Sequence, residues 1–252
     1  MGKTISIHSF RGGTGKSNVT ANLATYCALQ GAKVGVIDTD IQSPGVHVIF
    51  GLGNKKLKYT LNDFLYKKCD IESVAVDLTK SLKTKGDGKL YVFPAALDAN
   101  EITKILREGY EVNTMSEGFS EIMGTLKLDY LFIDTHPGLN EETFLSIALS
   151  DILLVILRPD EQDYLGTAVT LEISKKFEIP KIFLLINKVL PKYKAADVAK
   201  QLTKTFHVPV AGVFYYSEDF ADAASKDIFI LNNPEHAFSK TIQEVYGNIM
   251  KD

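Results

Sequence analysis

Short apolar runs alternate with amphipathic stretches along the whole chain of 252 residues. Seven of these runs predict β-strands, at residues 4–9, 33–37, 90–93, 130–134, 152–157, 181–186 and 208–214. Several are almost continuously apolar, which is typical of strands covered on both faces. Since parallel strands need crossover helices between them, the alternation predicts an α/β fold with a doubly wound, mostly parallel sheet and helices on both faces.

The stretches between the strands carry apolar residues at helical spacing. Val19, Leu23 and Cys27 predict the first helix, and Gly31 stands where it should stop. Further helices are predicted at residues 101–107, 116–126, 141–149, 164–177, 195–206 and 237–250. Residues 51–88 are the most polar and lysine-rich part and predict one helix plus mobile surface. No repeat or linker divides the chain, so we expect residues 1–252 to form a single domain.

Composition narrows the class of protein. Hydrophobic residues make up 45% and charged residues 23%, which excludes a disordered, collagen-like or coiled-coil chain. A net charge of −3 excludes a globally basic nucleic-acid binder but leaves a local basic patch open. Cys27 and Cys69 form no CxxC pair, which favours a reducing compartment without structural zinc. The longest apolar run, residues 152–157, is too short to span a membrane, so we expect a cytoplasmic protein.

A glycine-rich turn follows the first predicted strand and opens the first helix. Its sequence is Phe10-Arg11-Gly12-Gly13-Thr14-Gly15-Lys16-Ser17-Asn18. Glycines let consecutive backbone N–H groups curve around a phosphate, to which the helix N-terminus adds partial positive charge. In such loops the lysine reaches the β- and γ-phosphates and the hydroxyl ligates Mg²⁺. Phe10 replaces the first glycine of the strict pattern, but Gly-Lys-Ser in this context favours a P-loop NTPase over an ordinary turn.

Two aspartates follow the second predicted strand. Asp38 and Asp40 are two residues apart, so in an extended chain their side chains point to the same side. Both are therefore expected to face a bound phosphate and its Mg²⁺. Carboxylates at this edge of a parallel sheet stand over the ligand crevice. The competing interpretation of Asp40 is a helix N-cap or a solvated loop acid.

A third motif closes the strand at residues 130–134. Asp134 stands where a Walker B acid holds a water on Mg²⁺, and Gly138 can present an N–H group to a γ-phosphate. We interpret His136 as a loop histidine without a catalytic role, because Asp40 is already the expected partner of an in-line water.

Asn187 closes a late strand. Its amide offers a donor and an acceptor, which suits the N6/N7 edge of adenine. An asparagine that caps the following loop is the alternative.

These motifs, in this order and over nearly the full length, resemble the MinD/ParA family of deviant Walker A ATPases. The resemblance implies a slow, partner-stimulated, Mg²⁺-dependent ATPase that forms a homodimer across ATP. Its hydrolysis would act as a switch that positions or partitions a cellular cargo. The resemblance also implies a catalytic set of Lys16, Asp40 and Arg11 and a metal set of Ser17, Asp40 and Asp134. The implied nucleotide-binding set is Gly12, Gly13, Thr14, Gly15, Lys16, Ser17, Asn18, Gly138, Asn187 and Tyr216.

Two positions depart from the family pattern. Arg11 stands where the family has a signature lysine that reaches the partner's nucleotide, and Tyr215-Tyr216 stand where relatives tend to have Ile-Pro. Arg11 either crosses the dimer as an arginine finger or pairs with an acid near its own loop.

Other functions remain open on the same fold. A chaperone or metal/cofactor-insertion ATPase would need paired cysteines, and Cys27 and Cys69 stand apart; a small-molecule ligase is not excluded, because fold does not fix function. The cargo and the stimulating protein are unidentified. The switch would act on DNA or on a membrane. Three lysine clusters favour weak, salt-sensitive DNA binding. Membrane binding is disfavoured, because the apolar face of the last helix is typical of a helix packed on the core. The clusters are Lys55, Lys56 and Lys58; Lys80, Lys83, Lys85 and Lys89; and Lys188, Lys192 and Lys194.

Overall fold

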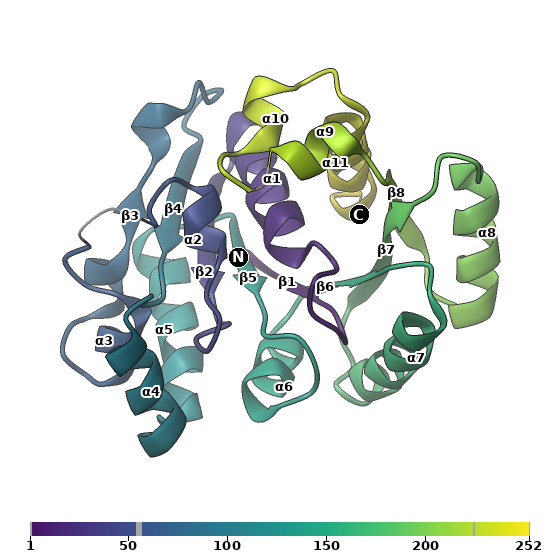
Figure 1. Cartoon of the computed structure of the whole chain (residues 1–252). Helices are drawn as coiled ribbons and strands as arrows, with labels where there is room; N and C mark the ends of the chain where they lie inside the picture. Colours follow the sequence, from purple (N-terminus) through teal and green to yellow (C-terminus); the bar gives the residue numbers. More distant parts are fainter. Residues whose placement is uncertain (1, 54–56, 224, 252) are drawn as a thin grey trace.

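An eight-stranded sheet crosses the computed structural model, which describes residues 2–53, 57–223 and 225–251 (Figure 1). Its order is β3-β4-β2-β5-β1-β6-β7-β8, and only β3 runs antiparallel to its neighbour. The strands are β1 Lys3–His8, β2 Lys33–Asp38, β3 Val76–Asp77, β4 Lys89–Phe93, β5 Tyr130–Asp134, β6 Ile152–Leu157, β7 Lys181–Val189 and β8 Val210–Tyr215. The seven predicted strands are all present, and the predicted doubly wound α/β fold is confirmed.

Helices cover both faces of the sheet (Figure 1). Packed on one face are α1 Lys16–Leu29, α2 Val46–Ile49, α10 Phe229–Asn232 and α11 Ala237–Ile249. Packed on the other are α3 Leu61–Leu65, α4 Ala99–Glu108, α5 Val112–Thr125, α6 Glu141–Ala148, α7 Glu161–Lys176 and α8 Ala195–Phe206. Three short elements complete the described chain: 3₁₀ helices η1 Ile71–Val74 and η2 Thr79–Ser81, and α9 Glu218–Asp222.

The differences from prediction lie in short elements and helix ends. The segment 51–88 holds α3, η1, β3 and η2 rather than one helix, and β3 is too short to show an alternating pattern. Helix α7 begins at Glu161 because the Asp160 side chain caps it by accepting the N–H of Asp163.

Alternation along the strands divides the apolar side chains between the two faces. Ile5 and Ile7 of β1 pack beneath α1, whereas Leu131 and Ile133 of β5 pack on the opposite side. All four are fully buried. No helix in the described ranges is both long and apolar enough to cross a membrane.

The sheet register brings the predicted motifs to one edge. Strands β1, β2 and β5 are neighbours and parallel, so their carboxyl ends meet. Asp38 lies opposite Asp134 across the β2–β5 pair, and Ile7 lies opposite Asp134 across the β1–β5 pair. The glycine-rich turn leaves β1 at this point and leads into α1 (Figure 1).

Candidate functional site

The turn between β1 and α1 presents a series of unpaired backbone N–H groups. Among the described residues, no hydrogen bond uses the backbone N–H groups of residues 12–18. Gly13 and Gly15 have φ of 73° and 97°, left-handed conformations that glycine adopts without steric cost. Gly15 is the N-cap of α1 and supplies no side-chain cap, so the first turn of α1 keeps its orphan donors. This arrangement is suited to an anion.

Lys16 adds a buried cation to the same turn. Its relative exposure is 8%, and it forms no ion pair or side-chain hydrogen bond with the described residues. The hydroxyl of Thr14 beside it is also buried without a partner. Buried polar groups are normally satisfied, so these groups point to a bound anion as their partner.

Asp134 lies at the end of β5 under this turn and is fully buried. Its Oδ1 accepts a hydrogen bond from the Thr20 hydroxyl of α1 at 3.3 Å. Burial, reinforced by the negative charge of Asp38, raises the pKa of Asp134 to about 7, although Lys16 and the Ser17 hydroxyl act in the opposite direction. A cation close to these oxygens would offset the cost of keeping them charged.

Asp38 and Asp40 have different roles, contrary to the expectation that both face the phosphate. β2 ends at Asp38, whose Oδ2 accepts the backbone N–H groups of Gly45 (2.9 Å) and Val46 (3.1 Å) at the start of α2. Asp38 therefore holds the loop after β2, and its oxygens are occupied within the chain. Asp40 lies in that loop, with its Oδ1 accepting the N–H of Ser43 at 3.1 Å. Its side chain is mostly buried, which is the main reason that its pKa is raised.

His136 contacts Asp40, although sequence analysis assigned it no role. Its Nε2 lies 3.8 Å from Asp40 Oδ1, and its Nδ1 lies 2.6 Å from the Pro137 carbonyl oxygen. The sequence could not show this, because the two residues come from separate loops after β2 and β5.

Gly138 is beside the glycine-rich turn, but its N–H group is occupied. The N–H donates to the Ser9 carbonyl oxygen at 3.1 Å, and the residue has a left-handed φ of 85°. In this conformation the N–H of Gly138 is therefore not available to a γ-phosphate, contrary to expectation. The hydrogen bond to Ser9 would have to break first.

Asn187 holds the glycine-rich turn instead of projecting freely. Its Nδ2 donates to the Thr14 carbonyl oxygen at 2.7 Å, and its Oδ1 accepts the N–H of Lys188 at 2.8 Å. The neighbouring Lys188 ammonium donates to the Gly13 carbonyl oxygen at 2.9 Å. One amide hydrogen and the second lone pair of the amide oxygen remain for a base, and the loop-capping alternative describes this conformation. A Cβ at Gly15 would collide with Nδ2 of Asn187, so this contact also requires glycine.

Asn18 and Tyr216 lie at the margin of the site. The Asn18 amide donates to the Ser225 hydroxyl at 2.8 Å, tying α1 to the segment that follows α9. Tyr216 follows β8 and is 48% exposed, and its side chain makes no hydrogen bond or aromatic pair with the described residues. Its exposed ring is available to contact a base, and its role in nucleotide binding stays a prediction.

Arg11 folds back onto its own subunit. Its Nη1 lies 3.6 Å from Asp160 Oδ1 and 3.6 Å from Asp163 Oδ1. Arg158 also pairs with Asp163, through Nε at 3.0 Å. In the single chain Arg11 therefore pairs with acids near its own loop, as the second alternative predicted. Its side chain nevertheless remains 40% exposed.

Phe10, the departure from the strict glycine pattern, packs on α7. A Cβ at Gly166 would collide with the Phe10 ring, so the absence of a side chain at Gly166 makes room for it. Sequence analysis missed this contact because the two residues are distant in the chain and glycine in a helix has many causes.

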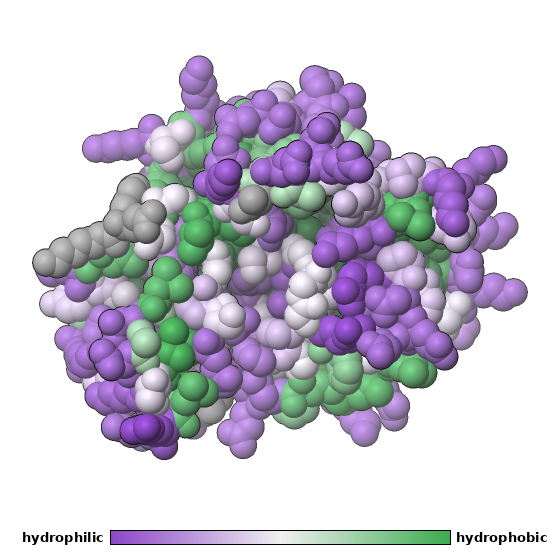
Figure 2. Space-filling model, viewed as in Figure 1, coloured by the Kyte–Doolittle hydropathy of each residue, from purple (hydrophilic) through white to green (hydrophobic). Residues whose placement is uncertain are grey.

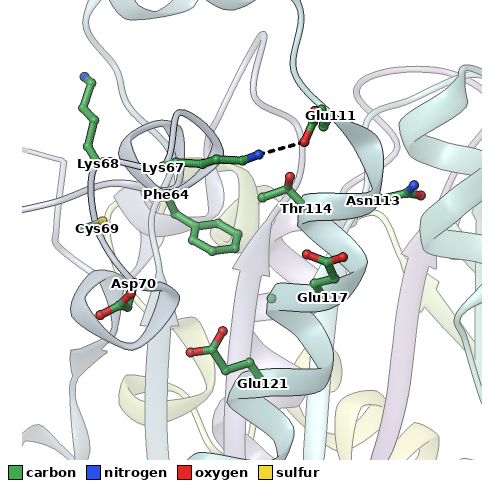
Figure 3. Close-up of a pocket in the computed structure, with 11 residues that line it drawn as sticks. Phe64, Lys67, Lys68, Cys69, Asp70, Glu111, Asn113, Thr114, Glu117 and Glu121 are labelled. Carbon is green, nitrogen blue, oxygen red and sulfur yellow. Dashed lines mark hydrogen bonds and ion pairs between the residues drawn. The ribbon is translucent and has the colours of Figure 1, made fainter.

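The larger hollows of the described surface lie elsewhere. One of about 640 Å³ runs between the turn after α3 and helix α5 (Figure 3). Lys67 is paired with Glu111 at its rim at 2.9 Å, while Glu117 and Glu121 line the wall along α5. Carboxylates outnumber ammonium groups in this lining, which disfavours a phosphate-bearing ligand. This hollow is therefore a poorer candidate for a phosphate site than the glycine-rich turn.

Comparison with known proteins finds a matching family model and several similar sequences. Residues 5–230 match the family model of the CobQ/CobB/MinD/ParA nucleotide-binding domain. An ATP-binding protein of Methanocaldococcus jannaschii is 27% identical over 99% of this chain and 88% of its own length. The septum site-determining protein MinD of Bacillus subtilis is 28% identical over 99% and 90%. An iron-sulfur cluster carrier protein of M. jannaschii is 30% identical over 73% of this chain, which spans only 59% of that protein.

Solved structures show the same fold. MinD of Pyrococcus horikoshii in complex with Mg-ADP superposes with a TM-score of 0.81 at 20% identity, covering 100% of this chain and 97% of that one. A plasmid partition protein of Borrelia burgdorferi bound to AMPPNP gives 0.75 at 21% identity, covering 99% of both chains.

Proposed function

The chain belongs to the CobQ/CobB/MinD/ParA nucleotide-binding family, and on that premise we propose that it binds and hydrolyses ATP as a molecular switch. In this proposal, ATP binding drives homodimerisation and hydrolysis reverses it. The dimer positions or partitions a cellular cargo together with a partner protein. MinD and plasmid partition proteins are among its relatives, which supports this assignment over other uses of the fold.

One observation carries the proposal: a buried, unpartnered Lys16 beside consecutive free backbone N–H groups at residues 12–18. Together they offer a positive, fixed cradle for the β- and γ-phosphates of a nucleotide. The N–H groups fix phosphate geometry, and the ammonium offsets charge that increases in the transition state.

The donor set also fits Mg²⁺. The Ser17 hydroxyl, Asp134 and Asp40 supply oxygen atoms, which this ion prefers. The described residues include no group of three or more His, Cys, Asp or Glu side chains able to hold a metal alone. We therefore infer that nucleotide phosphates and waters complete the coordination. Bound there, Mg²⁺ would neutralise phosphate charge and favour the charged form of Asp134, whose pKa is raised by burial and by the nearby charge of Asp38.

Asp40 is the residue best placed to orient the attacking water. Its carboxylate is held by Ser43 but, unlike that of Asp38, is not occupied by helix N–H groups. Lys16 is close enough to favour its charged form. A charged acceptor beside the phosphate cradle orients a water for in-line attack.

The proposed dimer would cover an apolar patch next to Arg11. Phe10, Leu165 and Val169 are 37%, 67% and 45% exposed and flank Arg11 in a hollow of about 450 Å³. In Figure 2 apolar side chains gather over α7, at the lower edge of a mostly hydrophilic face. An apolar surface of this kind is typical of a contact site.

Arg11 then has two states in the proposal. In the single chain it pairs with Asp160 and Asp163, and in the dimer it would release them and reach the nucleotide of the partner. We expect an Arg11→Ala protein and a Lys16→Ala protein, each inactive alone, to recover ATP hydrolysis when mixed. In the mixed dimer the Arg11→Ala subunit holds ATP and its partner supplies an intact Arg11.

Phosphate release from the mixture measures this complementation, and Asp160→Asn serves as a control that loosens the local pair without removing the arginine. If the Arg11→Ala protein alone hydrolyses ATP at the wild-type rate, Arg11 has only its local role.

An iron-sulfur or other cofactor-insertion ATPase is the alternative, since a relative of 30% identity is an iron-sulfur cluster carrier. Carriage of a cluster needs several thiolates together. Here Cys27 is buried in α1 and Cys69 lies apart from it on the other side of the sheet. A small-molecule ligase remains a further alternative.

We propose that the protein binds DNA weakly, rather than a membrane. Lys55 and Lys56 of the first cluster lie outside the described residues. In the other clusters, Lys188 and Lys85 already donate to Gly13 and Gln30, which leaves fewer ammonium groups free for DNA phosphates. Co-sedimentation of the ATP-bound dimer with DNA and with anionic liposomes at two salt concentrations separates the possibilities. We expect DNA binding that decreases with salt; binding to neither contradicts a surface-based switch.

Phosphate release from Mg-ATP by the wild-type protein tests the enzymatic part directly. We expect slow turnover that requires Mg²⁺. A protein that binds ATP but releases no phosphate over hours, alone or with cell extract, would contradict the proposed hydrolysis.

A further inference from the structure

The tautomer of His136 is fixed by its surroundings. Nδ1 lies 2.6 Å from the carbonyl oxygen of Pro137, which can only accept a hydrogen bond, so Nδ1 carries the hydrogen. In the neutral ring Nε2 is then an acceptor. This nitrogen lies 3.8 Å from Oδ1 of Asp40, a carboxylate oxygen that is also an acceptor.

Two acceptors at this separation do not bond each other, but they can share a donor. A single water at about 2.8 Å from both atoms can donate one hydrogen to each. The lone pairs of the water oxygen then point away from Asp40 and His136 and are free to attack a phosphorus atom. The phosphate site proposed above is close by, because the loops that carry Asp40 and His136 leave the carboxyl ends of β2 and β5, beside the end of β1. The N–H of Gly138, two residues after His136, donates to Ser9 at the start of the glycine-rich turn.

Both acceptors are held in place by the chain. The carbonyl oxygen of His136 accepts the Thr143 hydroxyl of α6 at 3.2 Å. On the other side, Asp40 Oδ1 accepts the N–H of Ser43, and the N–H of Asp40 donates to Asp38 Oδ1 at 3.2 Å. Preorganised acceptors of this kind keep a bound water in one orientation.

We propose that His136 is a second acceptor for the water that attacks ATP, acting through Nε2 together with Asp40. This inference rests on the proposed ATP hydrolysis and revises our interpretation of His136 as a loop residue without a catalytic role. In the step, the water oxygen forms a bond to the γ-phosphorus. The bond from that phosphorus to the bridging oxygen breaks, and its electron pair leaves with ADP. One water proton passes to Asp40, and the other stays on the phosphate formed.

Three substitutions separate this role from a structural one. His136→Asn places an amide nitrogen where Nδ1 was and keeps the donor to Pro137, but has nothing at the Nε2 position. His136→Gln restores a polar atom near the Nε2 position, and His136→Ala removes both. His207→Asn is the matched control, because His207 is exposed at the end of α8, away from the site.

We expect kcat for ATP hydrolysis to fall about 10- to 100-fold in both His136→Asn and His136→Ala, and to recover partly in His136→Gln. Affinity for a non-hydrolysable ATP analogue, measured by titration calorimetry, should stay within about twofold of wild type, because the water is not part of the bound nucleotide. His207→Asn should match wild type in both.

Full activity of His136→Asn, with loss only in His136→Ala, would overturn the proposal and leave His136 as a support for Pro137. Parallel loss of analogue affinity and kcat would also overturn it, since it would show a damaged loop. Absence of hydrolysis by the wild-type protein would instead refute the proposed function itself.

Discussion

Lys16→Ala is expected to bind no measurable ATP. The lysine is buried and has no partner in the described chain, so its charge is available to the β- and γ-phosphates at the N-terminus of α1. Without it the loop loses its buried cation, and the phosphates lie near the carboxylates of Asp134, Asp38 and Asp40 without that opposing charge. Isothermal titration with a non-hydrolysable analogue measures the loss.

Lys176→Ala is the matched control for that substitution. It removes the same charge from the last turn of α7, at the opposite end of the sheet, where Lys176 is exposed. Unchanged affinity in the Lys16→Ala protein would place the phosphate site elsewhere in the molecule.

Asp40→Ala is expected to retain ATP but to hydrolyse it about 10²–10⁴-fold more slowly, because its carboxylate acts on a water that is needed only in the transition state. The ATP-bound dimer should then accumulate. A phosphate-release assay and size-exclusion chromatography with light scattering measure the two effects.

Asp87→Ala, which removes an exposed carboxylate at the far end of the sheet, controls for the change in net charge. An Asp40→Ala protein that stays monomeric and hydrolyses ATP normally would remove Asp40 from the mechanism.

The sequence predicted which residues gather at the site because the sheet is parallel. Once Asp38 and Asp134 are placed at the carboxyl ends of buried strands, the register of β2 and β5 brings them opposite each other. The glycine-rich turn between β1 and α1 was predictable for the same reason, since the local pattern of strand, glycines and Gly-Lys-Ser depends on no distant contact.

What each side chain does there was less predictable, because it depends on partners far along the chain. Asn187 looked free to read a base, yet it bonds Thr14, which precedes it by 173 residues. Arg11 pairs with acids at the start of α7, and the N–H of Gly138 bonds Ser9. Loop conformation and side-chain rotamers decide these contacts, and neither has a signature in local sequence.

Short elements escaped prediction for a related reason. β3 contains two residues and is held by pairing with β4 rather than by its own pattern. Helix α2 is four residues long and begins where Asp38 accepts the N–H groups of Gly45 and Val46. Elements of this length are stabilised by tertiary contacts, which a single sequence does not display.

The molar mass of the wild-type protein in the presence of nucleotide tests the proposed switch most directly. In light scattering with Mg²⁺ and a non-hydrolysable ATP analogue, we expect a species of twice the 27.9 kDa chain mass, and with Mg-ADP a species of 27.9 kDa. The same mass in both nucleotides, with binding of each confirmed by titration, would contradict an ATP-dependent dimer.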